Sequence, residues 1–115
     1  MAVTGAYTIT GNTVKLTAAT SAPTPVQCTS VTLGGNQYRV INASTTTACF
    51  LSFAADAATA TANCVIPTGG GNNSSRTVYI LPSTNEVITF IPNAYFTAIT
   101  SANTCDLFIS PGDGF

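Results

Sequence analysis

The sequence contains no histidine and no tryptophan, and only 6% of its 115 residues are charged. Without histidine, one chain cannot build a Ser-His-Asp or Cys-His nucleophilic device. The basic residues are Lys15, Arg39 and Arg76, and the net charge is -1. Binding of nucleic acid needs clustered Lys and Arg side chains that replace counterions, so this charge balance excludes it. The same scarcity argues against a polybasic contact with a membrane.

The acidic residues do not form an evident catalytic pair, because each falls in a different expected segment: Asp56, Glu86, Asp106 and Asp113. We interpret them as solvated or turn-capping carboxylates rather than as a pair for glycoside chemistry. Gly69-Gly70-Gly71 lacks the Lys-Ser/Thr and the helix of a phosphate loop. Pro111-Gly112-Asp113-Gly114 lacks the further ligands of a calcium loop. We therefore expect no enzyme, no cofactor and no metal site.

Four cysteines are spread along the chain without a Cys-x-x-Cys pair: Cys28, Cys49, Cys64 and Cys105. Metal knuckles normally use such close pairs. Cys49 shares an expected strand face with Leu51, and Cys105 shares one with Leu107 and Ile109. Because a free buried cysteine behaves as a small hydrophobic residue, we favour reduced thiols in the core. At least one disulfide remains the alternative.

Long hydrophobic runs are also lacking, and none approaches the length of a membrane span. The first residues lack the basic and apolar regions of a secretory signal, so we expect synthesis and folding in a cytoplasm unless the chain is processed. So few charges would leave a lone monomer poorly soluble, because charged surfaces oppose association. We infer that much of the surface is covered in a homo-oligomer or a larger assembly.

What the sequence does contain is typical of short strands separated by turns. In residues 105–110 one face is apolar, the period-2 pattern of a strand packed against a core. Pro111-Gly112-Asp113-Gly114 is expected to end its pairing. Residues 93–115 thus predict a strand, a polar turn and a second strand. The other expected strands are residues 7–10, 13–17, 26–33, 37–42, 48–54, 63–67, 77–81 and 86–91.

Turn residues suggest how these strands connect. Gly11-Asn12 predicts a hairpin near the N-terminus, so that residues 6–18 could form an arm. Residues 82–85 predict a second hairpin, between strands 77–81 and 86–91. Strands 37–42 and 48–54 are expected to be antiparallel neighbours.

Two further segments are expected to lie outside the main strands. Residues 56–62 are expected to form a loop or edge strand, since threonines interrupt the alanines that could make a short helical turn. Residues 68–76 contain Gly69-Gly70-Gly71 and are expected to form an exposed, flexible loop.

These patterns predict one all-β domain over residues 1–115. We expect an antiparallel β-sandwich or jelly-roll-like fold with about eight to ten short strands and no substantial helix. Threonine, serine and asparagine supply most of the polarity, which suits strands and turns. The candidate core residues are Val40, Cys49, Leu51, Phe53, Val78, Ile80, Cys105, Leu107 and Ile109.

Strands 77–81 and 86–91 are apolar on both faces, which indicates that both faces are covered. Another subunit could supply the second cover, and a place in the middle of a sandwich or roll explains the pattern equally well. Arg39 is expected to be an exposed strand arginine stacked on a tyrosine, with an inter-subunit ion pair as the alternative. The candidate assembly interface consists of Tyr38, Arg39, Tyr79, Leu81, Ile88, Phe90 and Phe108.

Aromatic residues offer a further hypothesis. The tyrosines could form a platform for stacking a sugar, although tyrosine is also a normal strand residue and tryptophan is absent. The four tyrosines are Tyr7, Tyr38, Tyr79 and Tyr95.

Three segments together resemble small virion proteins of tailed bacteriophages: Gln37-Tyr38-Arg39-Val40-Ile41-Asn42, Thr97-Ala98-Ile99-Thr100, and Asp106-Leu107-Phe108-Ile109-Ser110-Pro111-Gly112-Asp113-Gly114. The resemblance is to capsid decoration (cement) or head-associated proteins and spans residues 37–114. It does not include the cysteines or the loop at 69–75. It implies a β-sandwich on the outer surface of an icosahedral capsid, commonly as a trimer, bound to the major capsid protein or another virion protein.

On these grounds we expect a non-enzymatic structural virion protein that decorates and stabilises a phage capsid. Its contacts would be apolar and threonine-rich. The alternative is a host-attachment or glycan-binding module on a virion fibre or tail.

Overall fold

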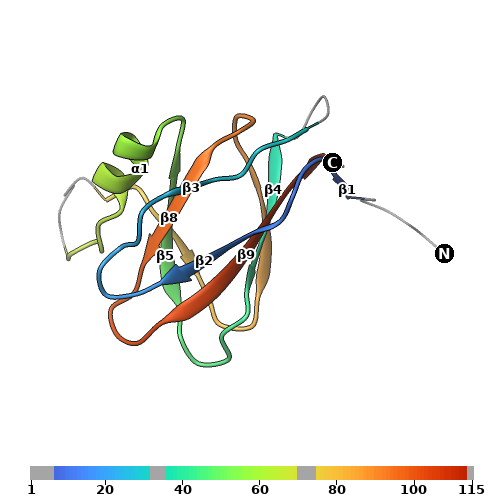
Figure 1. Ribbon diagram of the computed structural model, residues 1–115. Coiled ribbons are helices and arrows are strands. Elements are labelled where there is room, and N and C mark those ends of the chain that lie inside the picture. Colours follow the sequence, from blue (N-terminus) through green and yellow to red (C-terminus); the bar gives the residue numbers. More distant parts are fainter. Residues whose placement is uncertain (1–6, 32–35, 70–74, 114–115) are drawn as a thin grey trace.

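The computed structural model describes residues 7–31, 36–69 and 75–113 (Figure 1). These residues form nine strands in two antiparallel sheets and one short helix, which confirms the all-β fold class. The first sheet contains β1 (Thr8–Ile9), β2 (Val14–Ala18), β4 (Gln37–Asn42), β7 (Asn85–Thr89) and β9 (Cys105–Asp113). The second sheet contains β3 (Val26–Gln27), β5 (Cys49–Ala54), β6 (Val78–Ile80) and β8 (Tyr95–Ile99). The helix α1 covers Ala57–Asn63.

The strand order explains which parts of the sandwich are edges. In the first sheet β1 and β2 both pair with β9, and β4 and then β7 follow. In the second sheet the order is β3-β8-β5-β6. One edge of each sheet is therefore formed by the neighbouring segments β6 and β7.

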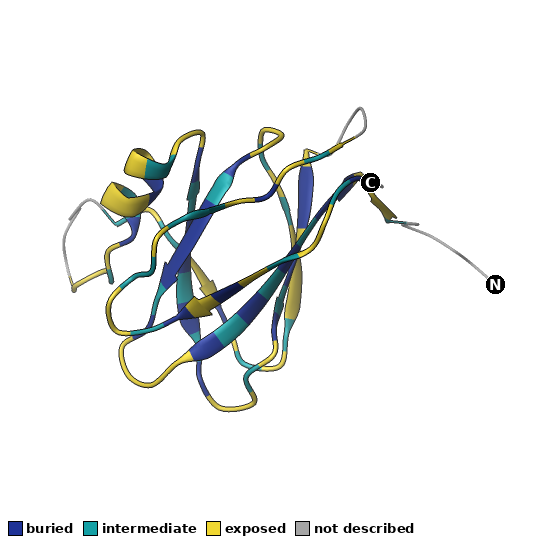
Figure 2. Ribbon diagram, viewed as in Figure 1, coloured by how far each residue is buried: buried dark blue, intermediate teal, exposed yellow. Residues whose placement is uncertain are grey.

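The core lies between the two sheets, and Figure 2 shows the buried residues concentrated along β4, β5, β8 and β9. The ring of Tyr38 on β4 meets that of Phe96 on β8 at 4.8 Å between centroids and so joins the sheets. The predicted core residues that are buried are Val40, Cys49, Leu51, Ile80, Cys105, Leu107 and Ile109.

Two predicted core residues have a different position. Phe53 is only half-buried, although it packs against the core cluster. Val78 was predicted to be buried, which is wrong, because its side chain is 38% exposed. It opens the three-residue edge strand β6, where no further strand covers it.

Several predicted strand pairings are wrong, because the connections cross between sheets. Strands β6 and β7 do not form a hairpin: β6 pairs with β5, and β7 pairs with β4. Likewise β4 and β5 are not neighbours, since they belong to different sheets. Packed sheets lie only about 10 Å apart, so a short polar loop can connect two neighbouring strands of one sheet or two strands of different sheets. The sequence of the loop does not distinguish these two connections.

The predicted N-terminal hairpin is also wrong. Strands β1 and β2 do not pair with each other but lie one after the other along β9. Gly11 allows two backbone segments to approach closely rather than forming a hairpin turn, because a Cβ at this position would lie 2.0 Å from the Thr29 carbonyl oxygen.

Strand β9 does not end at Pro111, contrary to the sequence prediction. It runs to Asp113 and pairs with β4 and β1 through Pro111 and Gly112. The Pro111 carbonyl accepts a hydrogen bond from the Thr10 N–H at 3.0 Å. Proline lacks only the donor, so its carbonyl still takes part in pairing.

Residues 56–62 were predicted to form a loop or edge strand, and most of them instead belong to α1. The Asp56 side chain caps the helix by accepting a hydrogen bond from the Thr59 N–H at 2.8 Å. Ala60 is buried, and its carbonyl accepts the Ser52 hydroxyl hydrogen at 2.9 Å, which fixes the helix to β5. The strand predicted at 63–67 is absent, because the helix extends to Asn63 and residues 64–67 have no strand pairing.

Some predictions fall partly outside the described residues. Of the strand expected at 26–33, β3 covers Val26–Gln27 and an isolated bridge joins Ser30 to Gly11, whereas residues 32 and 33 are not described. Most of the loop expected at 68–76, namely residues 70–74, is not described either. In the described residues, no helix has the length and apolar character needed to cross a membrane.

Candidate functional site

Exposed apolar side chains are concentrated in one stretch of the sequence. Five of the eight large hydrophobic residues recorded as exposed in the described chain lie between residues 78 and 91. They are Val78, Tyr79, Leu81, Val87 and Ile91. Contiguous exposed apolar surface commonly marks a site of interaction, whereas single exposed residues do not.

We call the apolar residues along these two edge segments the β6–β7 edge: Val78, Val87, Ile88, Phe90 and Ile91. Ile88 lies opposite the buried Tyr38 on the inner face of the first sheet, whereas Val87 lies opposite Arg39 on its outer face. Ile88 and Phe90 are half-buried and pack against the core, while the other three are exposed. Phe90, just after β7, meets Phe53 of β5 with ring centroids 4.9 Å apart. This contact joins the two sheets along the edge.

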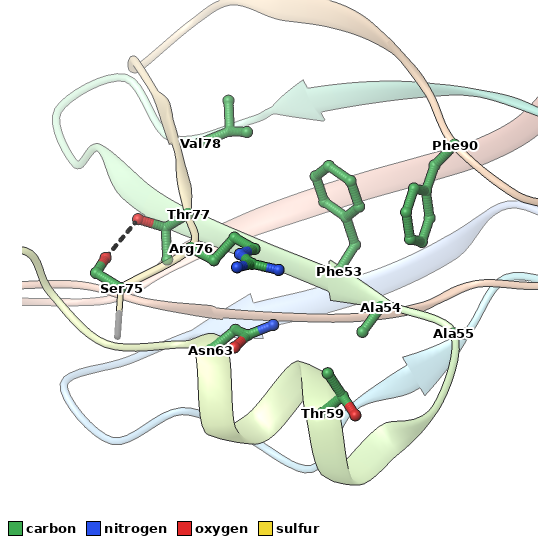
Figure 3. Close-up of a pocket in the computed structure, with 10 residues that line it drawn as sticks. All are labelled: Phe53, Ala54, Ala55, Thr59, Asn63, Ser75, Arg76, Thr77, Val78 and Phe90. Carbon is green, nitrogen blue, oxygen red and sulfur yellow. Dashed lines mark hydrogen bonds between the residues drawn. The ribbon is translucent and has the colours of Figure 1, made fainter. Parts of the chain in front are cut away.

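A cavity of about 520 Å³ opens beside this edge (Figure 3). It exists because β6 pairs with β5 only as far as Val78 opposite Leu51. Before that point the chain turns to the end of α1, where the Arg76 N–H donates to the Asn63 carbonyl at 3.0 Å. In Figure 3 the rings of Phe53 and Phe90 line one part of the cavity, and the Arg76 guanidinium projects into it.

Three charged residues lie at or beside the edge: Arg39 is opposite Val87 in the strand register, Arg76 lines the cavity, and Glu86 belongs to β7. Within the described residues the recorded ion pair joins Lys15 to Asp106 at 3.8 Å, and both side chains are well exposed. Glu86 lies opposite the buried Val40 and therefore stands on the inner side of the edge strand β7. An inward-pointing charge on an edge strand hinders uncontrolled pairing with further strands.

The predicted interface residues do not form one surface. Tyr38 was a wrong prediction, because it is fully buried: its hydroxyl donates to the Ile91 carbonyl at 2.5 Å and accepts the Ala94 N–H at 3.1 Å. Burial raises the pKa of this phenol. Strand alternation places Tyr38 on the same face as Val40, which was a predicted core residue, so this pattern was the signal that Tyr38 is buried.

The other predicted interface residues lie in three places. Ile88 and Phe90 belong to the β6–β7 edge. Arg39 and Phe108 lie on the outer face of the first sheet, where Arg39 is exposed and Phe108 half-buried. Tyr79 and Leu81 are exposed and line a second hollow.

Three edge residues were missed as interface candidates: Val78, Val87 and Ile91. The apolar character of both faces of 77–81 and 86–91 was the signal that could have found them. It indicated an unsatisfied surface but not which side chains face outward.

The predicted tyrosine platform is wrong, because the four tyrosines do not meet. Tyr38 is in the core, and the Tyr7 hydroxyl is bound between β4 and β9. Tyr79 instead pairs with Phe50, with ring centroids 4.7 Å apart.

The cysteines are all free and buried in the structure, as expected for core thiols. Burial raises the pKa of Cys28 to about 12 and that of Cys64 to about 11. Nucleophilic cysteines need a lowered pKa and access to solvent. These thiols therefore have the character of packing residues.

Comparison with known proteins finds no match to a family model, to a curated protein or to a solved structure. The proposed function therefore rests on the geometry of the β6–β7 edge and on the sequence.

Proposed function

We propose that this chain is a non-enzymatic structural virion protein that decorates a phage capsid and stabilises it through the β6–β7 edge. The observation that carries the proposal is the exposure of three apolar side chains along this edge: Val78, Val87 and Ile91. The resemblance of residues 37–114 to decoration and head-associated proteins gives the kind of assembly. It also favours a homotrimer on the outer capsid surface.

The mechanism follows from burial of the edge. Val78, Val87 and Ile91 would lose their contact with water against the capsid, and apolar burial contributes roughly 25 cal/mol per Å² removed from water. One such contact is modest. Many copies acting on one capsid, each engaging through several subunits of a trimer, would raise the total binding free energy by avidity without any new type of contact.

The test uses capsids assembled without this protein, to which purified protein is added back. We expect the protein to bind and to raise the temperature at which the capsids open. Val87→Asp and Ile91→Asp should each weaken binding by about tenfold or more, because each would place a carboxylate in an apolar contact. Co-sedimentation and scanning calorimetry measure both effects.

Ile9→Asp is the matched control. Ile9 is 54% exposed and Ile91 is 44% exposed, but Ile9 lies on β1 rather than on the β6–β7 edge. The control variant should bind like the original protein. Capsids equally stable with and without the protein, or edge variants that bind unchanged, would contradict the proposal.

A further inference from the structure

A second hollow lies on the outer face of the second sheet, in a region that the helix does not cover. Elsewhere this face is shielded: α1 packs on it through the Ser52–Ala60 bond, and the Thr97 hydroxyl donates to the Pro23 carbonyl at 2.8 Å. Phe50 on β5 and Tyr79 on β6 lie opposite each other in the strand register and stay outside this cover. The hollow that they share with Leu81 has a volume of about 360 Å³.

Its floor is aromatic. The rings of Phe50 and Tyr79 are 4.7 Å apart at their centroids and inclined by 41°, and Tyr79 is 54% exposed. The volume lies within the range of roughly 300–1,000 Å³ typical of small-molecule sites, which combine apolar walls with a few polar groups. An exposed pair of rings presents electron-rich faces to C–H groups of a ligand.

The rim is polar but neutral. Thr46, Ser101 and Asn103 stand around the aromatic floor, and none of the described residues that line the hollow is charged. The Thr46 hydroxyl, the Ser101 hydroxyl and the Asn103 amide make no hydrogen bond with other described side chains or backbone groups, so they remain available to a ligand. Such a rim suits a ligand that is uncharged and rich in hydroxyl groups.

Both rim segments are held in place by the protein itself. The Ser44 hydroxyl accepts the Thr47 N–H at 2.9 Å, and the Asn42 amide donates to the Thr47 carbonyl at 3.0 Å. On the other side, the Thr100 hydroxyl donates to the Asn103 carbonyl at 2.6 Å, and Asn103 has a positive φ of 64°. Because these segments are already ordered, binding costs little additional conformational entropy.

We infer that the Phe50–Tyr79 hollow is a binding site for one neutral pyranose unit of a carbohydrate. The apolar C–H face of the sugar stacks on Tyr79 and Phe50, and its hydroxyl groups bond to Thr46, Ser101 and Asn103. This site is separate from the β6–β7 edge, and the inference does not rest on the proposed role in capsid stabilisation.

The test is a titration of the isotope-labelled protein followed by amide NMR. The probes are the methyl glycosides of glucose, galactose, mannose and N-acetylglucosamine, with glucuronate as a charged comparison. At least one neutral glycoside should bind with a millimolar Kd, in keeping with a single-sugar contact. The amide signals of residues 46–48 and 101–103 should shift, and those of β7 should not.

Variants then identify the contacts. Tyr79→Ala should weaken binding by about tenfold, which corresponds to about 1.4 kcal/mol, while Tyr79→Phe keeps the ring and should bind nearly as well. Asn103→Gly tolerates the positive φ but lacks the amide, so it should also weaken binding. Val87→Asp, on the β6–β7 edge, should leave sugar binding unchanged.

The amide spectrum of each variant shows whether it is folded. The inference is overturned if no neutral glycoside shifts these signals at millimolar concentration, if only glucuronate binds, or if Tyr79→Ala binds like the original protein. Sugar binding that survives while the edge variants lose capsid binding supports two independent sites.

Discussion

At the scale of single residues, Tyr7 explains how β9 continues through a proline. The Tyr7 hydroxyl donates to the Ser110 carbonyl at 2.6 Å and accepts the Arg39 N–H at 3.2 Å, so it sits between β4 and β9. Its ring lies so close to Gly112 that a Cβ there would be 2.3 Å from the Tyr7 ring. Burial raises the pKa of this phenol. Tyr7 and Gly112 thus form one unit that keeps the end of β9 paired.

Removal of this hydroxyl should cost measurable stability. Tyr7→Phe keeps the ring over Gly112 but leaves the Arg39 N–H and Ser110 carbonyl without this partner, so we expect the free energy of unfolding to fall by about 1–2 kcal/mol. Urea unfolding measures the change. Tyr95→Phe is the control, because no hydrogen bond of the Tyr95 hydroxyl is recorded in the described part of the chain. An equal loss in both variants would contradict this role of Tyr7.

At the scale of elements, the sequence predicted strands better than their partners. Strands 37–42 and 105–110 were recognisable because their alternation matches the strand period, and their inner faces are indeed buried. The pairing of β6 with β5 and of β7 with β4 was not recognisable, since it depends on long-range packing rather than on the turn at 82–85. For these two strands the sequence showed only that both of their faces are rich in apolar residues.

The helix shows a different limit of sequence reasoning. Threonines lower the intrinsic helix propensity of residues 57–63, and a helix this short is unstable alone. It forms because Asp56 caps it and Ala60 is buried against β5. The Asp56 cap was readable from the sequence, but the burial of Ala60 was not.

The cap gives α1 a pH dependence that can be measured. Hydrogen bonds from the Thr59 N–H and hydroxyl lower the pKa of Asp56 below its usual 3.8. A lowered pKa means that the stabilisation is present above about pH 4 and is lost as the pH falls through the folded-state pKa. We expect Asp56→Ala to lower the melting temperature at pH 7, and Asp56→Asn to lower it less, because asparagine also caps helices.

Circular dichroism measures the melting temperatures of the three proteins between about pH 2 and about pH 7, a range that spans the usual carboxyl pKa of about 4. The difference between the original protein and Asp56→Asn should shrink in acid, since asparagine does not titrate. A difference that is constant over the whole range would show that the Asp56 charge does not support the cap.

At the scale of the whole molecule, the four thiols report on the integrity of the sandwich. Cys49 and Cys105 lie on strands of different sheets, and both are buried. Burial, and then the neighbouring Cys105 thiol, raise the pKa of Cys49, in keeping with two thiols that lie close together in the core. Cys28 follows β3 and is fully buried, whereas Cys64 follows α1 and is 6% exposed. Three of the four thiols are therefore enclosed by both sheets, and the fourth is enclosed by the helix end.

This arrangement predicts the order in which the thiols react with an alkylating reagent under native conditions. Cys64 should react first, because local opening of α1 exposes it, while Cys28, Cys49 and Cys105 should react together and only upon opening of the sheets.

The raised thiol pKa values also imply that the free energy of unfolding is at its full value below about pH 9, the usual thiol pKa, and declines as the pH rises toward 11–12. The unfolded thiols ionise in this range, whereas the folded ones do not. Mass spectrometry of timed samples at about pH 8 and about pH 10, below and above the usual thiol pKa, measures both effects. A Cys64→Ala variant should remove the early phase and leave the slower one unchanged. Alkylation of Cys28 before Cys64, or fewer than four reactive thiols after denaturation without reductant, would contradict this description of the core.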